Sequence, residues 1–206
     1  MERGNRLHIA VEGCVGVGKT TLATRLASAR KSTLVLEEFE KNPFLEEFYS
    51  NPTENVFETE MQFLLLHYHQ LKRLSKTRET ITDFTFIKDI VFAETNIIDM
   101  AEKEMFIELY QFLLARLPKP DLIIYLKGSE DLIIERIRRR NRTNELKTDV
   151  AYFKKLKRAY DAFFSSYEGR IHFIDAEHFD FLNSPHVLDE VCKIIDSSPS
   201  GKVIHS

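Results

Sequence analysis

The residues with the clearest chemical meaning form a glycine-rich run near the N-terminus. The run fits the pattern G-x-x-x-x-G-K-[ST] and consists of Gly13, Cys14, Val15, Gly16, Val17, Gly18, Lys19 and Thr20, with Thr21 directly after it. Glycines let backbone amides curl around phosphate oxygens, and the amino end of a following helix adds positive potential. A lysine there reaches the outer phosphates, and a threonine hydroxyl can hold Mg²⁺. The run therefore predicts a nucleotide-binding loop with Lys19 as a catalytic cation and Thr20 as a metal ligand; the alternative is a turn that binds nothing.

A second group of residues is basic and lies in the second half of the chain. It consists of Arg136, Arg138, Arg139, Arg140 and Arg142. On a helix, residues four apart share a face, so only some of these side chains can reach one ligand. We expect an arginine-rich lid over about 138–148, in which Arg140 and Arg142 are catalytic groups acting on a transferring phosphoryl group and Arg136 contacts the nucleotide. The alternative is a solvated basic face.

Acidic residues follow two of the apolar runs. Glu37 and Glu38 end one run, and Asp83 ends another. In an open parallel sheet, ligands bind outside the carboxyl ends of the strands, so these acids and the glycine-rich run should meet in one crevice. There Asp83 can share the metal with Thr20. Helix capping or solvation is the alternative for each acid taken alone.

Short apolar runs alternate with amphipathic segments along the chain. Strands are expected at 7–11, 32–36, 80–84, 121–126 and 170–174. Helices are expected at 19–29, 53–76, 86–94, 100–117, 129–140, 150–167 and 185–195, with a short one opening at Asn42 and Pro43. This alternation predicts an α/β fold, an open parallel five-stranded sheet with helices on both faces. We expect a single domain over 1–196 and a mobile tail over 197–206.

The composition excludes several classes of protein. The chain has 206 residues, of which 43% are hydrophobic and 30% charged, as in globular domains and unlike disordered chains. The net charge of -3 gives no overall basic field, so we expect no nucleic-acid partner. We expect no membrane partner either, because no apolar run is long enough for a membrane span or a secretory signal.

Cysteine and histidine positions carry little functional signal. Cys14 and Cys192 cannot form a disulfide framework, which favours a reducing, cytoplasmic location. His67 and His69 are two residues apart and therefore lie on different faces of a helix, so we expect no metal site there.

These features together resemble the deoxyribonucleoside kinases related to bacterial deoxyadenosine and deoxyguanosine kinases. The resemblance extends from about Leu7 to Leu182. It is carried by the glycine-rich run, residues 36–45 with Phe48 and Tyr49 after them, residues 118–121, and residues 135–145. Together these segments are more specific than the glycine-rich run alone, which many unrelated nucleotide-hydrolysing proteins share.

The resemblance implies a P-loop kinase fold and ATP-dependent phosphorylation of a nucleoside 5′-hydroxyl, with ATP and Mg²⁺ as cofactors and a homodimer as the assembly. It matches Glu37 to the general base and Asp89 to a base contact, while Tyr49 and Glu145 match sugar contacts. A carboxylate at a strand end can also accept a hydroxyl proton on physical grounds alone. Two alternatives stay open. One is a P-loop kinase for another small alcohol or nucleotide, such as a pterin alcohol or a nucleoside monophosphate, and the other is a nucleotide sensor without turnover.

One departure from the family pattern concerns charge near the expected base. Relatives carry an acid-arginine-serine triplet after the third strand, whereas here Asp83 is followed by Phe84 and Thr85. The arginine is missing. Lys88, one helical turn beyond Phe84, is a candidate to supply the charge and to contact the substrate.

A second departure is Glu60, which stands where relatives place a glutamine that hydrogen-bonds the base. An ionised glutamate only accepts hydrogen bonds, so it fits the adjacent N–H donors of guanine better than adenine or cytosine. Phe57, three residues earlier, is expected on the same helical face, where its ring can pack on the base. We therefore predict a purine deoxyribonucleoside with a guanine-like edge as the substrate; the alternative is that Glu60 is solvated.

Overall fold

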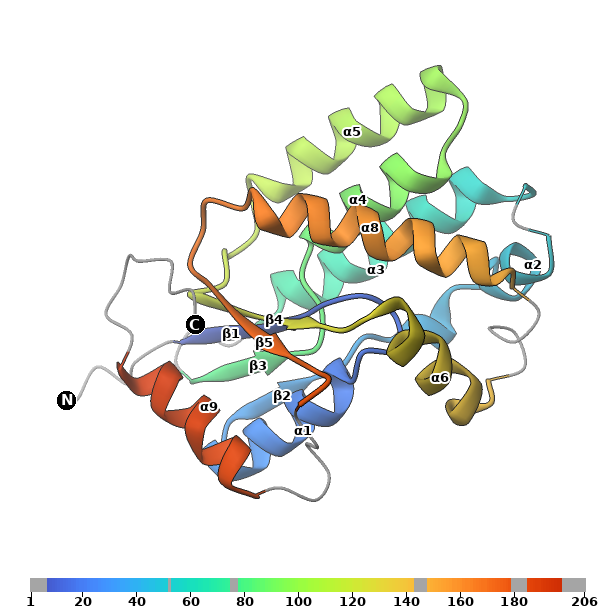
Figure 1. Ribbon diagram of the computed structural model, residues 1–206. Helices are drawn as coiled ribbons and strands as arrows, with labels where there is room; N and C mark the ends of the chain where they lie inside the picture. The colour runs from blue at the N-terminus through green and yellow to red at the C-terminus, as the bar shows by residue number, and fades with distance from the viewer. Residues whose placement is uncertain (1–6, 52, 75–77, 143–147, 179–184, 198–206) are drawn as a thin grey trace.

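A parallel β-sheet forms the centre of the protein. The computed structural model describes residues 7–51, 53–74, 78–142, 148–178 and 185–197. These residues contain five strands, which form one parallel sheet in the order β2-β3-β1-β4-β5 (Figure 1). The strands are β1 (His8–Glu12), β2 (Thr33–Val35), β3 (Thr80–Thr82), β4 (Leu122–Lys127) and β5 (Ile171–Asp175). The predicted open parallel sheet is confirmed.

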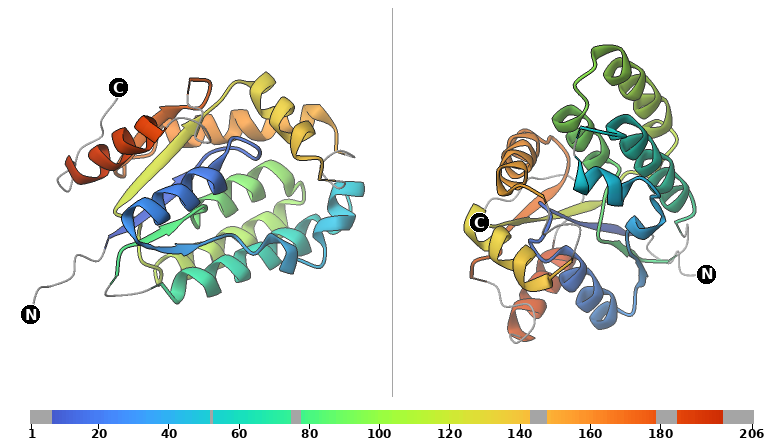
Figure 2. Two further views of the ribbon diagram at one scale, coloured as in Figure 1. Left: turned by 90° about the horizontal axis from the view of Figure 1, so that it is seen from below. Right: turned by 90° about the vertical axis from the view of Figure 1, so that its right-hand side faces the viewer.

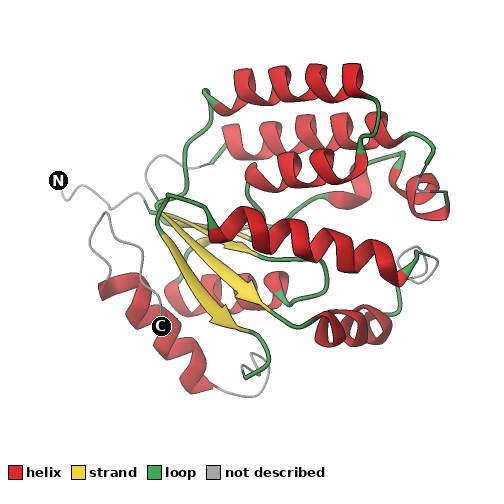
Figure 3. Ribbon diagram, turned by 45° about the horizontal axis from the view of Figure 1, so that its top comes forward, coloured by secondary structure: helices red, strands yellow, loops and turns green. Residues whose placement is uncertain are grey.

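Helices cover both faces of the sheet (Figures 1 and 2). One face carries α1 (Lys19–Arg30) and α9 (Pro185–Ser197), and the other carries α3 (Val56–Lys72), α4 (Ile87–Asn96), α5 (Met100–Leu114) and α8 (Val150–Ser165). Three further elements lie on the side of the molecule toward which the strand arrows point (Figure 3): η1 (Phe39–Lys41), α2 (Leu45–Ser50) and α6 (Glu130–Arg140). In the described part of the chain, no helix is long and apolar enough to cross a membrane.

Burial explains why the central strands form. Ile9, Ala10 and Val11 of β1 are fully buried, and residues 122–126 of β4 are buried as well. Parallel strands covered by helices on both faces read as continuous apolar runs, as these do. Each buried aliphatic side chain contributes about 1.5–3 kcal/mol, so that Ile123→Ala should cost about 2–5 kcal/mol once its cavity is included. Packing of the buried central strands thus fixes the positions of their carboxyl ends relative to one another.

Element boundaries differ from the predicted ones where side chains bind the backbone. β2 ends at Val35, because the Gln70 amide donates to the carbonyl of Leu36 and the Asp83 carboxylate accepts from the next backbone amide. α3 begins at Val56 rather than at residue 53, because Asn55 adopts a left-handed conformation (φ 51°) that interrupts a helix. The helix predicted at 100–117 ends at Leu114.

The ends of α6 set the position of the arginine-rich segment. The Ser129 hydroxyl accepts a hydrogen bond from the backbone N–H of Leu132 (3.0 Å), which begins the helix as the sequence predicts. The helix ends at Arg140, and the next residue, Asn141, has a φ of 55° that turns the chain sharply. This turn places Arg142 at the edge of the pocket described below.

Candidate active site

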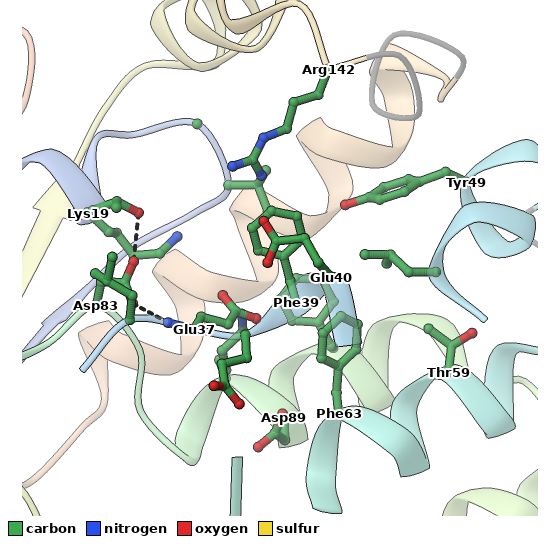
Figure 4. A pocket seen from close by; sticks show the side chains of 18 of the residues that line it. Lys19, Glu37, Phe39, Glu40, Tyr49, Thr59, Phe63, Asp83, Asp89 and Arg142 are labelled. Carbon is green, nitrogen blue, oxygen red and sulfur yellow. Dashed lines mark hydrogen bonds and ion pairs between the residues drawn. The ribbon is translucent and has the colours of Figure 1, made fainter. Parts of the chain in front are cut away.

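A pocket of about 1310 Å³ lies at the carboxyl ends of the strands. It is lined by residues from the glycine-rich loop, from the segments that follow β2 and β3, from α2, α3 and α4, and from the end of α6. Figure 4 shows Lys19, Glu37, Asp83, Asp89 and Arg142 around it. Pockets for one small ligand typically measure roughly 300–1,000 Å³, so this one has room for an acceptor and the phosphates of a donor.

The glycine-rich loop has the backbone shape of a phosphate cradle. Gly13 and Gly16 have φ values of 141° and 84°, which side chains other than glycine rarely adopt. A Cβ atom at Gly13 would lie 2.6 Å from the carbonyl oxygen of Leu126, and one at Gly16 would lie 2.8 Å from Ile137. Lys19 Nζ donates to the carbonyls of Gly13 (2.8 Å) and Cys14 (3.1 Å), which holds the amine at the mouth of the loop.

A buried carboxyl anchors this loop to the neighbouring strand. Glu12 is fully buried; its Oε2 accepts from the N–H of Gly13 (3.0 Å), and its Oε1 accepts from the N–H and the hydroxyl of Thr85 (both 2.8 Å). Burial raises the pKa of Glu12, and the nearby Lys19 cation opposes that rise. Glu12 therefore fixes the loop relative to the segment after β3, which carries Asp83.

The residues predicted to hold a metal lie side by side. Thr20 Oγ1 donates to Asp83 Oδ2 (2.6 Å), and Asp83 Oδ1 accepts from the backbone N–H of Glu37 (2.8 Å). Within the described residues, no cluster of three or more His, Cys, Asp or Glu side chains could hold a metal ion. Mg²⁺ fits a hydroxyl and a carboxylate of this kind, because it keeps several waters and takes its other ligands from phosphates.

The carboxylate of Glu37, which lines the pocket, meets the side chains of Lys88 and His67. Its Oε1 accepts from Lys88 Nζ at 2.6 Å and from His67 Nε2 at 3.2 Å. Burial alone would raise the pKa of Glu37, but Lys88 and His67 outweigh burial and hold the pKa below its usual range. Glu37 is therefore ionised at neutral pH.

His67 contacts two of the predicted site residues, an arrangement that the sequence did not indicate. From the sequence we considered His67 only as a metal ligand, yet its Nδ1 lies 2.6 Å from Asp89 Oδ1 and its Nε2 contacts Glu37. Glu60, Phe63 and His67 follow one another at helical spacings of three and four along α3. A search for polar residues on the Glu60 face of this helix would have found it.

Two buried acids, Asp89 and Glu60, also line the pocket. Asp89 is 2% exposed, and its Oδ2 has no hydrogen-bond partner among the described residues. Glu60 is also 2% exposed and accepts from Asn96 Nδ2 (2.7 Å). Burial raises the pKa of Glu60 to about 8, with Asp89 adding to the rise, which favours the protonated form at neutral pH over the ionised form expected from the sequence. The alternative of a solvated Glu60 is wrong, because the side chain is buried.

Phe57 does not occupy the predicted place against the base. It packs partly buried against the core and is not among the pocket-lining residues, whereas Phe63 lines the pocket. Residues three apart on a helix are rotated by about 60°, so Phe57 and Phe63 flank Glu60 on opposite sides. The pocket lies on the Phe63 side. Phe39 and Phe92 supply further aromatic surface.

The arginine-rich segment reaches the pocket in part. Arg140 and Arg142 line it, and the Arg142 guanidinium lies 4.2 Å from the centre of the Phe39 ring. Arg136 donates to the carbonyl of Val17 in the glycine-rich loop (2.5 Å). Tyr49 lines the pocket as well, while Glu145 and residues 143–147 of the predicted lid lie outside the described residues.

A phosphate-binding loop at the carboxyl edge of a parallel sheet, facing an ionised carboxylate and two acids, defines a P-loop phosphotransferase that acts on a small molecule. The family model for deoxynucleoside kinases matches residues 9–198. The chain belongs to the deoxynucleoside kinase family.

Characterised relatives agree with this assignment. The deoxyguanosine kinase of Bacillus subtilis is 37% identical over 158 residues, covering 74% of this chain and 76% of that protein. The deoxyadenosine kinase of Dictyostelium discoideum is 31% identical, covering 90% of this chain and 78% of that protein. The solved structure of deoxyadenosine kinase from M. mycoides with the products dCMP and dCDP bound superposes with a TM-score of 0.82 at 27% identity, covering 93% of this chain and 99% of that one. The same enzyme with bound dATP gives a TM-score of 0.82.

Proposed function

We propose that this kinase transfers the γ-phosphoryl group of ATP to the 5′-hydroxyl of a purine deoxyribonucleoside, with deoxyguanosine as the preferred acceptor. The observation that carries the proposal is the position of Glu37. Its backbone N–H binds Asp83, which contacts Thr20 on the phosphate side, and its carboxylate binds His67, which contacts Asp89 on the opposite side. Glu37 thus stands between a phosphate site and an acid-lined subsite.

The phosphate side supplies charge neutralisation. The backbone amides of the glycine-rich loop would cradle the donor phosphates, Lys19 would contact the outer ones, and Thr20 and Asp83 would hold Mg²⁺. The metal, when bound, neutralises charge on the phosphate oxygens. Arg140 and Arg142 line the same pocket and would neutralise the equatorial oxygens of the transferring group.

The acceptor side supplies orientation and a base. The 5′-oxygen of the nucleoside attacks the γ-phosphorus, the bond from that phosphorus to the β-phosphate oxygen breaks, and ADP leaves. Glu37 accepts the hydroxyl proton as the new bond forms, since its carboxylate is ionised and held in place by Lys88 and His67. A positioned base contributes about 10²–10⁴-fold, and alignment contributes the larger part of the acceleration. Tyr49 and Glu145 are proposed sugar contacts.

The acid-lined end supports a nucleobase rich in N–H donors. Asp89 Oδ2 is buried and accepts no hydrogen bond from the described residues. An amino or imino group of a nucleobase would supply the missing donor. Guanine offers adjacent N1–H and N2–H donors. Asp89 Oδ2 can accept one of them, and the carboxylate of Glu60 can accept the other once it is ionised. Phe63 and Phe92 offer apolar surface for the flat ring. The similarity to deoxyguanosine kinase of Bacillus subtilis supports the same choice.

A substrate panel tests the proposal. Purified protein with ATP and Mg²⁺ would be assayed with deoxyguanosine, deoxyadenosine, deoxycytidine, thymidine and deoxyinosine, which keeps the N1–H of guanine but lacks its amino group. We expect the highest kcat/KM for deoxyguanosine and an intermediate value for deoxyinosine. A pyrimidine as the best acceptor would contradict the purine assignment, and product phosphorylated at the 3′-hydroxyl would contradict the position of Glu37.

We also propose that the protein is a homodimer that pairs through α5. This helix lies on the outside of the helical layer (Figure 1), and its Met105 and Phe112 are 58% and 56% exposed, seven residues apart on one face. Ile98 and Met100, at the start of the helix, are exposed as well. Large exposed apolar side chains that gather on one element are typical of protein interfaces. Sedimentation of the parent and of Phe112→Glu tests this, since the variant should be monomeric.

A further inference from the structure

His67 joins two carboxylates that come from different elements of the fold. Its Nδ1 lies 2.6 Å from Asp89 Oδ1 on α4, and its Nε2 lies 3.2 Å from Glu37 Oε1 in the segment after β2. An ionised carboxylate only accepts hydrogen bonds, so with Glu37 and Asp89 both ionised each ring nitrogen of His67 carries a proton. Burial raises the pKa of Asp89, and the positively charged imidazole opposes that rise.

Packing fixes the orientation of this ring. The His67 side chain is 1% exposed; its ring stacks on Phe63 (centroids 5.5 Å apart) and packs at a tilt of 34° against the buried Phe84 (4.8 Å). Contact with both rings restricts the tilt of the imidazole. Its two N–H groups consequently point along fixed directions.

The charges around His67 favour the cationic form. The carboxylates of Asp89 and Glu37 lie against its two ring nitrogens, and Lys88 is the basic group beside Glu37, while Glu60 stays protonated at neutral pH and adds no charge. Burial would lower the pKa of His67, but Asp89 and Glu37 outweigh burial and raise the pKa to about 9. The imidazole is thus protonated throughout the neutral range, in agreement with the geometry.

We propose that His67 is a positioning residue with two separable tasks: its Nε2–H orients the Glu37 carboxylate for proton acceptance, and its Nδ1–H orients Asp89 for binding the nucleobase. This inference rests on the proposed function. Lys88 and His67 both bind Oε1 of Glu37, which directs Oε2 to the acceptor hydroxyl. In the same way, His67 binds Oδ1 of Asp89 and leaves the buried Oδ2 for a donor of the base.

Two substitutions of His67 separate these tasks. The amide nitrogen of asparagine can replace Nδ1, and that of glutamine can replace Nε2. We expect His67→Asn to lower kcat about tenfold or more with the nucleoside KM nearly unchanged, because the hydrogen bond to ionised Glu37 is lost. We expect His67→Gln to raise the nucleoside KM about tenfold or more with a smaller change in kcat, because the hydrogen bond to Asp89 is lost.

His69→Asn and His69→Gln are the matched controls, because His69 lies on the same helix and is exposed. Both should match the parent in kcat and KM. Thermal unfolding and ATP binding of all four variants would establish that they fold. The same fall in kcat and the same rise in KM in both His67 variants would show a merely structural role and overturn the proposal.

A measurement on the parent protein avoids the question of whether variants fold. Nitrogen-15 NMR of histidine-labelled protein would report the protonation of His67, with its signal assigned by its loss in His67→Gln. We expect both ring nitrogens to be protonated at pH 7 in the absence of substrate. A neutral ring with one protonated nitrogen would overturn the proposal. A parent that phosphorylates no purine deoxyribonucleoside would overturn the proposed function instead, and the NMR result would still stand.

Discussion

The Nζ atom of Lys88 lies 2.6 Å from Oε1 of Glu37, and the two side chains are 9% and 15% exposed. The sequence departs from its family by having Phe84 after Asp83, where relatives have an arginine. Lys88, on the first turn of α4, brings a cation to Glu37 from a different position in the chain. The aromatic ring of Phe84 meanwhile packs against His67. The departure therefore removes an arginine without leaving Glu37 unpaired.

Lys88→Met should lower kcat about 10- to 100-fold, because Glu37 loses a charged hydrogen-bond donor that fixes its orientation. Lys88→Arg should recover much of this loss, since arginine restores the charge and the donor. Steady-state kinetics with thermal unfolding of both variants would check this. Parent-like turnover by a folded Lys88→Met would show that His67 alone positions Glu37.

Glu60 should make stability depend on pH. Its pKa is raised from 4.5 to about 8 by burial, so between these values the folded protein keeps a proton that the unfolded chain has lost. Its contribution to the free energy of unfolding is therefore complete below about pH 4.5 and is lost as the pH rises towards 8. Over that range the parent should lose on the order of 1–4 kcal/mol more than Glu60→Gln does. Parallel stability profiles from denaturant titration would contradict the assignment.

Glu60 should also make the choice of substrate depend on pH. A protonated Glu60 is a donor and an acceptor, as glutamine is, whereas the ionised form accepts the two N–H donors of guanine. The ratio of kcat/KM for deoxyguanosine to that for deoxyadenosine should rise with pH up to about 8, by at most about tenfold per unit. In Glu60→Gln the ratio should be flat and shifted towards deoxyadenosine. A rising ratio in the variant would assign the effect to another group.

The arginines of α6 and its C-terminal turn should differ in importance. Arg142 and Arg140 line the pocket, whereas Arg138 and Arg139 are exposed and lie outside its lining. Arg142→Ala or Arg140→Ala should lower kcat about tenfold or more, while the same change at Arg138 or Arg139 should have little effect. Four small and equal losses would instead indicate a diffuse basic surface.

Lys19→Ala should abolish most ATP affinity and turnover without unfolding the domain. The Lys19 amine donates hydrogen bonds to loop carbonyls at the pocket, and Lys19 is not part of the hydrophobic core. Calorimetric titration with ATP, together with a thermal melt, would measure both properties. ATP binding equal to that of the parent would contradict the phosphate-loop assignment.

The sheet could be predicted from sequence because its signals are local. The apolar run of β1, the glycine-rich turn and the first residues of α1 follow one another, and each element is specified by its own residues. The predicted ends of strands and helices differ from the observed ends where distant side chains bind the backbone, as Gln70 and Asp83 do after β2. Propensity and periodicity contain no information on such contacts.

Site residues that follow strand ends could be predicted from the sequence, whereas those that depend on packing between distant segments could not. Glu37 and Asp83 could be found because they end strands that share one edge of the sheet. His67 could not, because its partners Glu37 and Asp89 lie 30 and 22 residues away along the chain. The protonation of Glu60 depends on complete burial, which only the packed structure reveals.

The central claim is that Glu37 accepts the proton of a deoxyribonucleoside 5′-hydroxyl. Single-turnover transfer from γ-labelled ATP to deoxyguanosine, compared between the parent, Glu37→Gln and Glu38→Gln, tests it most directly. Glu38 is the matched control, since its carboxylate pairs with exposed Lys41. We predict 5′-labelled product, a rate at least ~10²-fold lower for Glu37→Gln with ATP binding intact, and a near-parent rate for Glu38→Gln. Equal rates for the parent and Glu37→Gln, or a loss confined to Glu38→Gln, would contradict the account.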